Sequence, residues 1–307
     1  MRRYTFTRGL SYAPIVAASE RVAWTVDGVF QDRRFDASRP IVPPSWVGTA
    51  GLRFLNEADQ LVLNHCRAFS YVHLLRNFEE FVPPHLTDSA ADAWHADRAR
   101  LRTLFRFGEE EMKHQQLFER AERVLEESCG HGFSRFFDDG GARVTEMTQN
   151  LLGHSPLGRF LIILALEWGT QRHYVESVHG AAVTDGLYAD VLKAHWVEEA
   201  QHTKVDALEI AALAETMSAE ELTAAFDDLL AIGALVDAKF AGQAKREVET
   251  LVGVRGRDLP DDESAELLRA LHASLSANMA GVGLGHPRFA LVARELSAEG
   301  AAKLGIA

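Results

Sequence analysis

The sequence contains only two cysteines, Cys66 and Cys129, in 307 residues. Two cysteines are too few for a disulfide framework and match no zinc-ribbon spacing. No apolar run reaches the ~18 residues that suggest a membrane-spanning helix. The short apolar run at residues 12–18 contains a proline, which argues against a signal peptide. We therefore expect a cytoplasmic protein that does not enter a membrane.

Basic residues are also scarce, because 32 lysines and arginines face 44 acidic residues and give a net charge of −12. This balance argues against nucleic acid or an anionic membrane surface as the main partner. The apolar fraction of 47% and the charged fraction of 25% are ordinary for a globular protein. A small-molecule substrate and a basic protein partner are both compatible with this composition.

Strand signals are absent, and helical periodicity dominates from Leu55 onward. Pro83-Pro84 is expected to stop the first helix, and Ser155-Pro156 reads as an N-cap followed by proline at the first helical position. Long helices with short connections predict an all-α bundle. The expected helices cover residues 55–82, 88–128, 156–180, 186–217, 219–252 and 263–279, with a shorter one near 141–152.

The chain shows no repeat, low-complexity tract or linker, so we expect one domain over residues 1–307. Residues 1–50 lack helical periodicity and are expected to form an extended arm lying on the bundle. Residues 55–217 hold the core helices. Residues 218–307 supply additional helices, which either cover the bundle or form a homodimer interface, and composition does not separate these.

Two Glu-x-x-His segments carry the main chemical signal, Glu111-x-x-His114 and Glu199-x-x-His202. Residues three apart on a helix share a face, so each pair can offer a carboxylate and an imidazole to one metal ion. The pairs lie on different expected helices, as a metal site in a bundle core requires.

A glutamate at position 167 ends the apolar run of residues 160–166. A carboxylate there is costly unless a metal or another partner compensates it. A third Glu-x-x-His pair, Glu176 with His179, begins on the opposite side of this helix and is set aside. In the first helix, Glu79 falls inside the apolar arc and is preferred, with its neighbour Glu80 as the alternative.

His195 lies four residues before Glu199, so His195, Glu199 and His202 share one stripe of their helix. The candidate metal ligands are therefore Glu79, Glu111, His114, Glu167, His195, Glu199 and His202. Carboxylates with imidazoles suit iron or manganese, and four carboxylates balance two divalent cations.

These residues resemble those of the ferritin-like di-iron carboxylate superfamily across residues 55–217. The resemblance rests on Glu79, on Glu167 and on the two Glu-x-x-His pairs, in that order along the chain. Successive glutamates lie 32, 56 and 32 residues apart (79 to 111, 111 to 167, 167 to 199), near the spacing of the oxygenase branch. The resemblance implies a ferritin-like four-helix bundle, and the segment 110–114 is similar to the paired-glutamate segment of acyl-carrier desaturases.

The added His195 is similar to the seventh-ligand pattern of the AurF-type arylamine N-oxygenases. Those enzymes use a stable peroxo-di-iron species to oxidise aryl amines. The resemblance implies that the seven candidates bind two iron ions, and a mixed manganese–iron pair is not excluded because the ligand types serve both. It also implies dioxygen as a reactant and an external electron donor, such as a ferredoxin or a flavin reductase.

The expected function is a di-iron oxygenase that oxidises a small organic substrate, with N-oxygenation of an amine as the best specific reaction. Carbon hydroxylation or desaturation on the same centre is the near alternative. A non-catalytic iron-binding or iron-storage bundle is the alternative from another class.

Several further polar positions stay open. Thr170, Gln171 and Tyr174 share the Glu167 face and either line a substrate cavity or pack in the core. Asp206 either orients an imidazole or lies on the surface. His173 is expected to face outward or to support the ligands from behind. In the acidic run 109–111 the first two members are expected to be solvated, and residues 281–285 are expected to form a flexible hinge.

Overall fold

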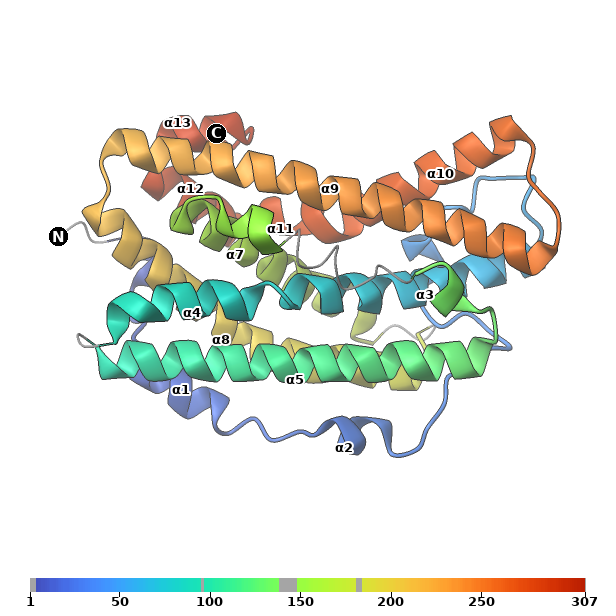
Figure 1. Cartoon of the computed structure of the whole chain (residues 1–307), viewed down its shortest axis with the longest axis horizontal. Coiled ribbons are helices and arrows are strands. Elements are labelled where there is room, and N and C mark those ends of the chain that lie inside the picture. The colour runs from blue at the N-terminus through green and yellow to red at the C-terminus, as the bar shows by residue number, and fades with distance from the viewer. Residues whose placement is uncertain (1–3, 95–96, 138–147, 181–183, 307) are drawn as a thin grey trace.

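The computed structural model describes residues 4–94, 97–137, 148–180 and 184–306. Within these ranges the regular structure is helical and no strand occurs. Long helices run side by side along the molecule, with the first residues on one edge and the last helices on the opposite edge (Figure 1). The all-α prediction is confirmed.

The bundle core consists of four helices. They are α3 (Glu57–Glu79), α5 (Arg98–Cys129), α7 (Pro156–His173) and α8 (Gly186–Thr216). Helix α3 packs on α5, α5 on α8 and α8 on α7. Side chains cap the helix starts, since Asn56, Asp97, Ser155 and Asp185 each accept a hydrogen bond from a backbone N–H of the first turn. This is the four-helix bundle core that the sequence predicted.

The two prolines after the first helix do not act as expected. Helix α3 ends at Glu79, and Pro83 and Pro84 lie in the first turn of a separate helix, α4 (Val82–Ala93). Proline is well suited to that position because the first N–H groups of a helix have no intrahelical acceptor. The expected single helix over 88–128 is therefore two helices, with Asp97 capping the start of α5.

Two other expected helices also differ. Helix α7 ends at His173 and continues as a π-helical turn, η4 (Tyr174–Val178), instead of running to residue 180 as an α-helix. The expected helix near 141–152 lies mostly outside the described residues. Its described part, 148–152, is helical.

The N-terminal arm lies on the bundle, against α5 and α8, as the blue segment along one edge of Figure 1 shows. It is more regular than expected. It contains two short α-helices, α1 (Tyr12–Ser19) and α2 (Val26–Phe30), and two 3-10 turns, η1 (Thr5–Thr7) and η2 (Pro44–Trp46). A further turn, η3 (Phe133–Arg135), follows α5.

The additional helices cover the bundle. Helix α9 (Ala219–Arg255) packs across α3 and α7, and α10 (Asp261–Ser276) packs on α9. The chain continues through a π-helical turn, η5 (Ala277–Gly281), and through α11 (Val282–Leu284), α12 (Pro287–Leu296) and α13 (Ala298–Lys303). In the part of the chain that the structure describes, no helix combines the length and apolarity needed to cross a membrane.

Most of the glycine-rich stretch 281–285 is helical, with residues 281–284 in η5 and α11 and Gly285 in the turn that follows, so the expectation of a flexible hinge was wrong. A Cβ built on Gly283 would lie 1.8 Å from the carbonyl oxygen of Ala165 in α7. Only glycine permits this close approach. The contact holds η5 and α11 against α7, next to the bundle interior.

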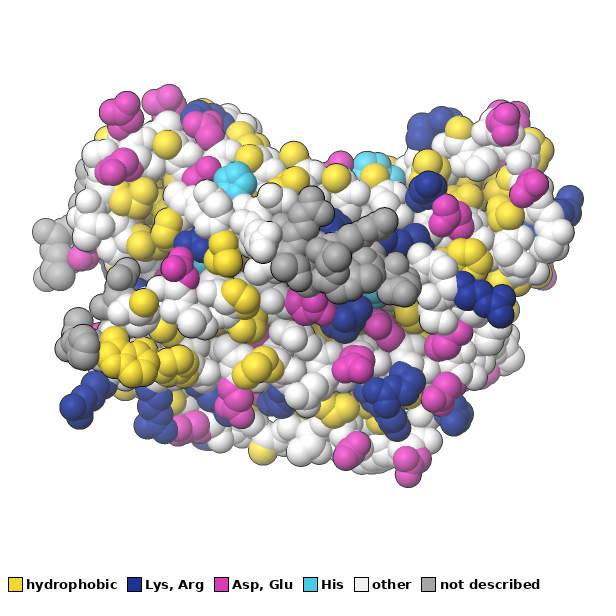
Figure 2. All heavy atoms as spheres, in the orientation of Figure 1, with side chains coloured by type: hydrophobic (Ala, Val, Ile, Leu, Met, Phe, Trp, Pro, Cys, Tyr) yellow, Lys and Arg dark blue, Asp and Glu magenta, His cyan; other side chains and the backbone are white. Residues whose placement is uncertain are grey.

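Acidic and basic side chains are interspersed on the face seen in Figure 2. The densest group of carboxylates and histidines lies inside the bundle, and each of the seven candidate ligands is at most 7% exposed.

Candidate metal centre

The seven candidate ligands converge in the bundle core from all four helices. Glu79 comes from α3, Glu111 and His114 from α5, Glu167 from α7, and the remaining three from α8. Two overlapping groups have donor atoms within 4.8 Å of one another. One consists of Glu79, His114, His195 and Glu199, and the other of Glu111, His114, Glu199 and His202.

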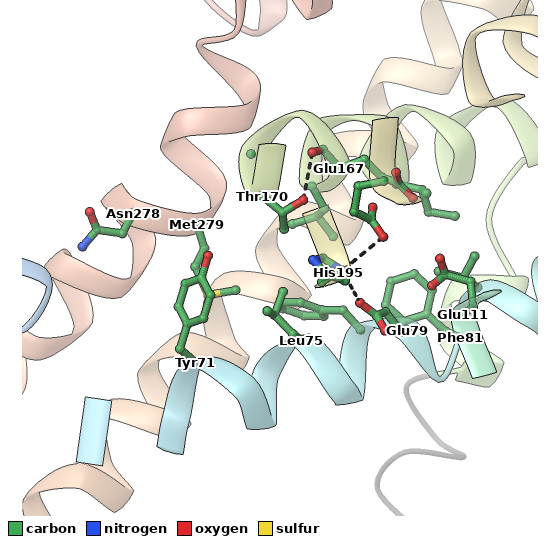
Figure 3. A pocket seen from close by; sticks show the side chains of 16 residues that line it. Tyr71, Leu75, Glu79, Phe81, Glu111, Glu167, Thr170, His195, Asn278 and Met279 are labelled. Atoms are coloured by element: carbon green, nitrogen blue, oxygen red, sulfur yellow. Dashed lines mark hydrogen bonds and ion pairs between the residues drawn. The ribbon is translucent and has the colours of Figure 1, made fainter. Parts of the chain in front are cut away.

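The first group gathers around His195, which points into the cluster (Figure 3). Its Nε2 lies 2.7 Å from Oε1 of Glu79 and 3.1 Å from Oε1 of Glu199. Nδ1 of His114 lies 3.3 Å from the same Glu199 oxygen. Four donors from three helices therefore face one point.

The second group gathers around His202. Its Nδ1 lies 2.9 Å from Oε1 of Glu111, 3.2 Å from Oε1 of Glu199 and 3.8 Å from Oε1 of Glu167. Glu199 Oε1 faces all three histidines, and Glu199 belongs to both groups, so it would be a ligand in either. Glu167 completes the side of the cluster formed by α7.

The donor atoms fit metal binding because the protein does not satisfy them. Burying polar atoms without partners is costly, and native proteins avoid it. Six buried donor atoms of the cluster make no well-aligned hydrogen bond among the described residues, although some of them lie within ion-pair distance of one another. They are Glu79 Oε2, Glu111 Oε1, His114 Nδ1, Glu167 Oε2, Glu199 Oε1 and His202 Nδ1. Two cations at this place would satisfy all six and neutralise the four carboxylates.

Burial and mutual repulsion raise the pKa values of two carboxylates in the cluster. Burial raises the pKa of Glu79 to about 7, with the charge of Glu111 adding to the effect and His195 opposing it. Burial also raises the pKa of Glu167 well above its usual range, and the neighbouring Glu199 and Asp206 raise it further. Without cations, part of this cluster holds protons.

The histidines respond in the opposite sense. Burial alone would lower the pKa of His195, but Glu199 and Glu79 raise it to about 10. The pKa of His114 is likewise raised, to about 9, because Glu79, Glu111 and Glu198 outweigh burial. A metal ligand must be a neutral imidazole, so metal binding here displaces protons.

The structure separates the candidates from their sequence neighbours. Glu80 turns away from the cluster and pairs with Arg76 at 2.8 Å. Glu176 and His179 are exposed, and Glu176 pairs with Arg172 at 2.8 Å.

Two glutamates that the sequence analysis did not identify contact candidate histidines on the side away from the cluster. Glu198 is fully buried, and its Oε2 accepts a hydrogen bond from Nε2 of His114 at 2.9 Å. Its other oxygen accepts from Lys113 Nζ. This contact fixes the imidazole so that Nδ1 faces the cluster.

Glu110 does the same for His202. Its Oε2 lies 3.1 Å from His202 Nε2, and its Oε1 accepts a hydrogen bond from Ser19 of the arm and pairs with Arg106. Glu110 is 2% exposed, so the expectation that it is solvated was wrong. The expectation for Glu109 is confirmed, since its side chain is 62% exposed.

The two supports are reciprocal across the helix pair. Glu110 in α5 holds His202 of α8, and Glu198 in α8 holds His114 of α5. In both helices the supporting glutamate directly precedes a candidate ligand, which gives the pattern Glu-Glu-x-x-His twice. This doubled glutamate was the sequence signal that could have identified them.

Asp206 is fully buried, so its surface alternative was wrong. Neither of its oxygens has a hydrogen-bond partner among the described residues. Burial raises its pKa well above the usual range, with His202 opposing and Glu111 adding to the shift. Asp206 therefore interacts with the charges of the cluster, but it does not orient an imidazole through a hydrogen bond.

A small cavity opens beside the cluster (Figure 3). Thr170 lines it, and Tyr174 lines a smaller adjoining space. Gln171 instead donates a hydrogen bond to the carbonyl oxygen of Trp196. The apolar wall of the cavity consists of Leu75, Phe78, Phe81, Val82, Ile163, Leu166 and Met279.

No protein-family model and no curated protein matches this sequence. Among solved structures, it is similar to a variant of an R2-like ligand-binding oxidase with an aerobically reconstituted Mn/Fe cofactor, at 11% identity and a TM-score of 0.44. That match covers 88% of this chain and 94% of the other. Another R2-like ligand-binding oxidase with that cofactor is similar at 12% identity and a TM-score of 0.40, over 86% and 91% of the two chains.

Proposed function

We propose that this protein is a dimetal oxidoreductase that uses dioxygen to oxidise a small organic substrate, and that the reaction is N-oxygenation of an amine. Two bound iron ions, or one manganese and one iron, would supply the electrons that activate dioxygen. The seven ligands would be Glu79, Glu111, His114, Glu167, His195, Glu199 and His202.

The observation that supports this most directly is the set of six buried donor atoms that face one another in the core without a well-aligned hydrogen bond. The protein's own residues would have three tasks in the reaction. Glu110 and Glu198 hold two imidazoles in the binding orientation. The apolar cavity wall excludes water from the oxidised group. The four carboxylates balance the charge of the cations.

His195 supports N-oxygenation over hydroxylation, because a third histidine is the feature by which the sequence resembles the AurF-type N-oxygenases. Its Nε2 lies within 3.1 Å of two cluster carboxylates, so a third imidazole faces the site. Oxidation of an amine to a hydroxylamine consumes one dioxygen, two electrons and two protons and releases water. An external donor such as a ferredoxin or a flavin reductase would provide the electrons.

The test begins with metal content after anaerobic loading with ferrous iron. We expect about two irons per chain, as two-metal bundle sites hold, and we expect Glu199→Ala to lose most of this iron. Glu176→Ala is the matched control, because Glu176 belongs to the exposed Glu-x-x-His pair, and it should bind iron as the wild type does.

The loaded protein is then supplied with dioxygen, a chemical reductant and 4-methylaniline, and products are identified by mass spectrometry. A hydroxylamine or a further oxidised nitrogen supports the proposal. A ring or methyl hydroxylation product would replace N-oxygenation by carbon hydroxylation. Failure to bind stoichiometric metal would remove the basis of the proposed function.

A further inference from the structure

Two series of polar contacts connect the N-terminal arm to the candidate metal ligands. Each begins at an arm residue, passes through a basic side chain of α5 and a buried glutamate, and ends at a histidine of the cluster. The arm lies along α5 in Figure 1. The two basic residues, Arg106 and Lys113, are seven positions apart (106 to 113), so they share one face of the helix.

The first series ends at His114. In the arm, the Trp24 ring has Lys113 Nζ 4.2 Å from its centroid and is parallel to the His114 ring. Lys113 forms an ion pair with Oε1 of Glu198, whose other oxygen lies 2.9 Å from Nε2 of His114. The Glu198 side chain is 0% exposed and that of Lys113 is 25% exposed. The ammonium group is therefore held between an aromatic face and a buried carboxylate.

The second series ends at His202. Nε of Arg106 donates a hydrogen bond to Oγ of Ser19 in the arm at 2.8 Å, and its Nη2 lies 3.1 Å from Oε1 of Glu110. Ser19 donates to the same Glu110 oxygen, and the other Glu110 oxygen lies 3.1 Å from Nε2 of His202. The same order of arm residue, cation, glutamate and histidine therefore occurs twice.

A cation behind such a glutamate changes the electronic properties of the histidine. A carboxylate that accepts the N–H of an imidazole makes the opposite ring nitrogen a stronger donor to a metal. A cation paired with that carboxylate attracts part of its charge, so the imidazole donates less strongly. The positive charge also repels the metal ion directly, because partly buried charges are only weakly screened. Both effects oppose oxidation of the ion, since oxidation adds one positive charge, and both therefore raise the reduction potential.

We propose that Lys113 and Arg106 raise the reduction potential of the bound metal ions, and that the N-terminal arm sets this potential by holding both cations on their glutamates. The inference rests on the proposed function, because it requires the dimetal centre. Neither residue is a candidate ligand, so both are positioning residues that act through the glutamates behind the histidines. The potential then depends on the docked arm as well as on the ligands.

The test is the midpoint potential of the full chain loaded with ferrous iron, followed by its visible spectrum during an anaerobic titration with a one-electron mediator. The measured step is the oxidation of a ferrous ion, whose electron passes to the mediator. Lys113→Met should raise the ratio of oxidised to reduced centre about tenfold at a given potential, which lowers the midpoint by about 59 mV. Arg106→Met should lower it similarly. An unchanged or raised midpoint in either variant would overturn the inference.

Two further variants separate the charge from the packing of the side chain. Lys113→Arg keeps the charge and should keep the wild-type midpoint, so a shift as large as that of Lys113→Met would show a packing role and contradict the inference. Lys193→Met is the matched control, because Lys193 lies two residues before the candidate ligand His195 but is exposed. It should leave the midpoint unchanged. An equal shift in this control would show a general effect of net charge and overturn the role of the glutamates.

Trp24→Leu tests the contribution of the arm. It leaves Lys113 charged but removes the ring that holds it, so the midpoint should fall by less than in Lys113→Met. A wild-type midpoint would overturn the role given to the arm. Iron content is measured for every variant and should match the wild type. Because neither dioxygen nor an amine is present, these shifts can occur in a protein that oxidises no amine and can be absent from one that does, so the two proposals can fail separately.

Discussion

At the residue scale, the most informative feature is the pair of glutamates behind the candidate ligands. Glu198 touches His114 on the side away from the cluster, and Lys113 touches Glu198. The carboxylate keeps Nδ1 pointing inward and makes the imidazole a stronger donor. Metal affinity therefore depends on residues that never touch the metal.

We predict that Glu198→Gln weakens Mn²⁺ binding about 10- to 100-fold, the usual effect of losing such a support. The measurement is a titration against a chelator of known affinity. Glu109→Gln is the matched control, because Glu109 also lies in an acidic pair before a candidate ligand but is exposed. Equal affinities for the two variants would contradict the role given to Glu198.

The sequence identified much of the site at this scale and missed part of it for a physical reason. Helical spacing placed all seven candidates on inward faces, and the apolar arc of the first helix preferred Glu79, which lies in the cluster, over Glu80, which pairs with Arg76. Spacing within one helix does not show which residue of another helix a side chain meets. The contacts of Glu110 with His202, and of Glu198 with His114, arise only when α5 and α8 pack.

At the element scale, close packing of the late helices on α7 shapes the cavity. Gly283 lets α11 approach Ala165, and a Cβ on Gly169 would lie 2.9 Å from the carbonyl oxygen of Met279. These contacts bring Met279 to the cavity wall. The helices after residue 218 therefore form part of the site and are not only a cover.

We predict that Gly283→Ala destabilises the protein by about 1–3 kcal/mol, because the added methyl group must push α11 away from α7. Urea unfolding followed by circular dichroism gives the difference. Gly242→Ala in α9 is the control, since its Cβ would meet nothing within 4 Å. That change should stabilise the protein by about 0.5–1 kcal/mol, and a similar loss in both variants would argue against the close-contact explanation.

Helix boundaries were predicted unevenly from the sequence. Ser155-Pro156 marked the start of α7 correctly, because capping is a local interaction. Pro83-Pro84 was read as an end and proved to be a beginning, since proline is compatible with both. The helical stretch 280–284 was missed because its glycines serve a contact with α7, which lies more than 100 residues earlier in the sequence.

At the scale of the whole molecule, buried histidines make stability depend on pH. His85 is 2% exposed, and burial, with Arg159 nearby, lowers its pKa to about 3. The unfolded chain has a histidine pKa of about 6.5. Between these values the unfolded state binds more protons, so stability is complete above about pH 6.5 and falls as the pH decreases.

We predict that His85 contributes up to about 1.4 kcal/mol per pH unit to this acid destabilisation. His85→Phe should reduce the slope of unfolding free energy against pH between pH 7 and 5, whatever its effect on absolute stability. His179→Phe, at an exposed position, should retain the wild-type slope. An unchanged slope in His85→Phe would mean that this histidine is not buried in its neutral form.

The N-terminal arm has a consequence for the lifetime of bound metal. The Trp24 ring is parallel to the His114 ring, with centroids 6.0 Å apart, and Lys113 Nζ lies 4.2 Å from the centroid of the Trp24 ring. Ser19 donates a hydrogen bond to Glu110. The arm donates no candidate ligand, yet Trp24 covers the His114 ring and Ser19 supports the glutamate that contacts His202. We therefore expect detachment of the arm, a segment that precedes every candidate ligand in the chain, to limit the rate at which bound ions exchange with the medium.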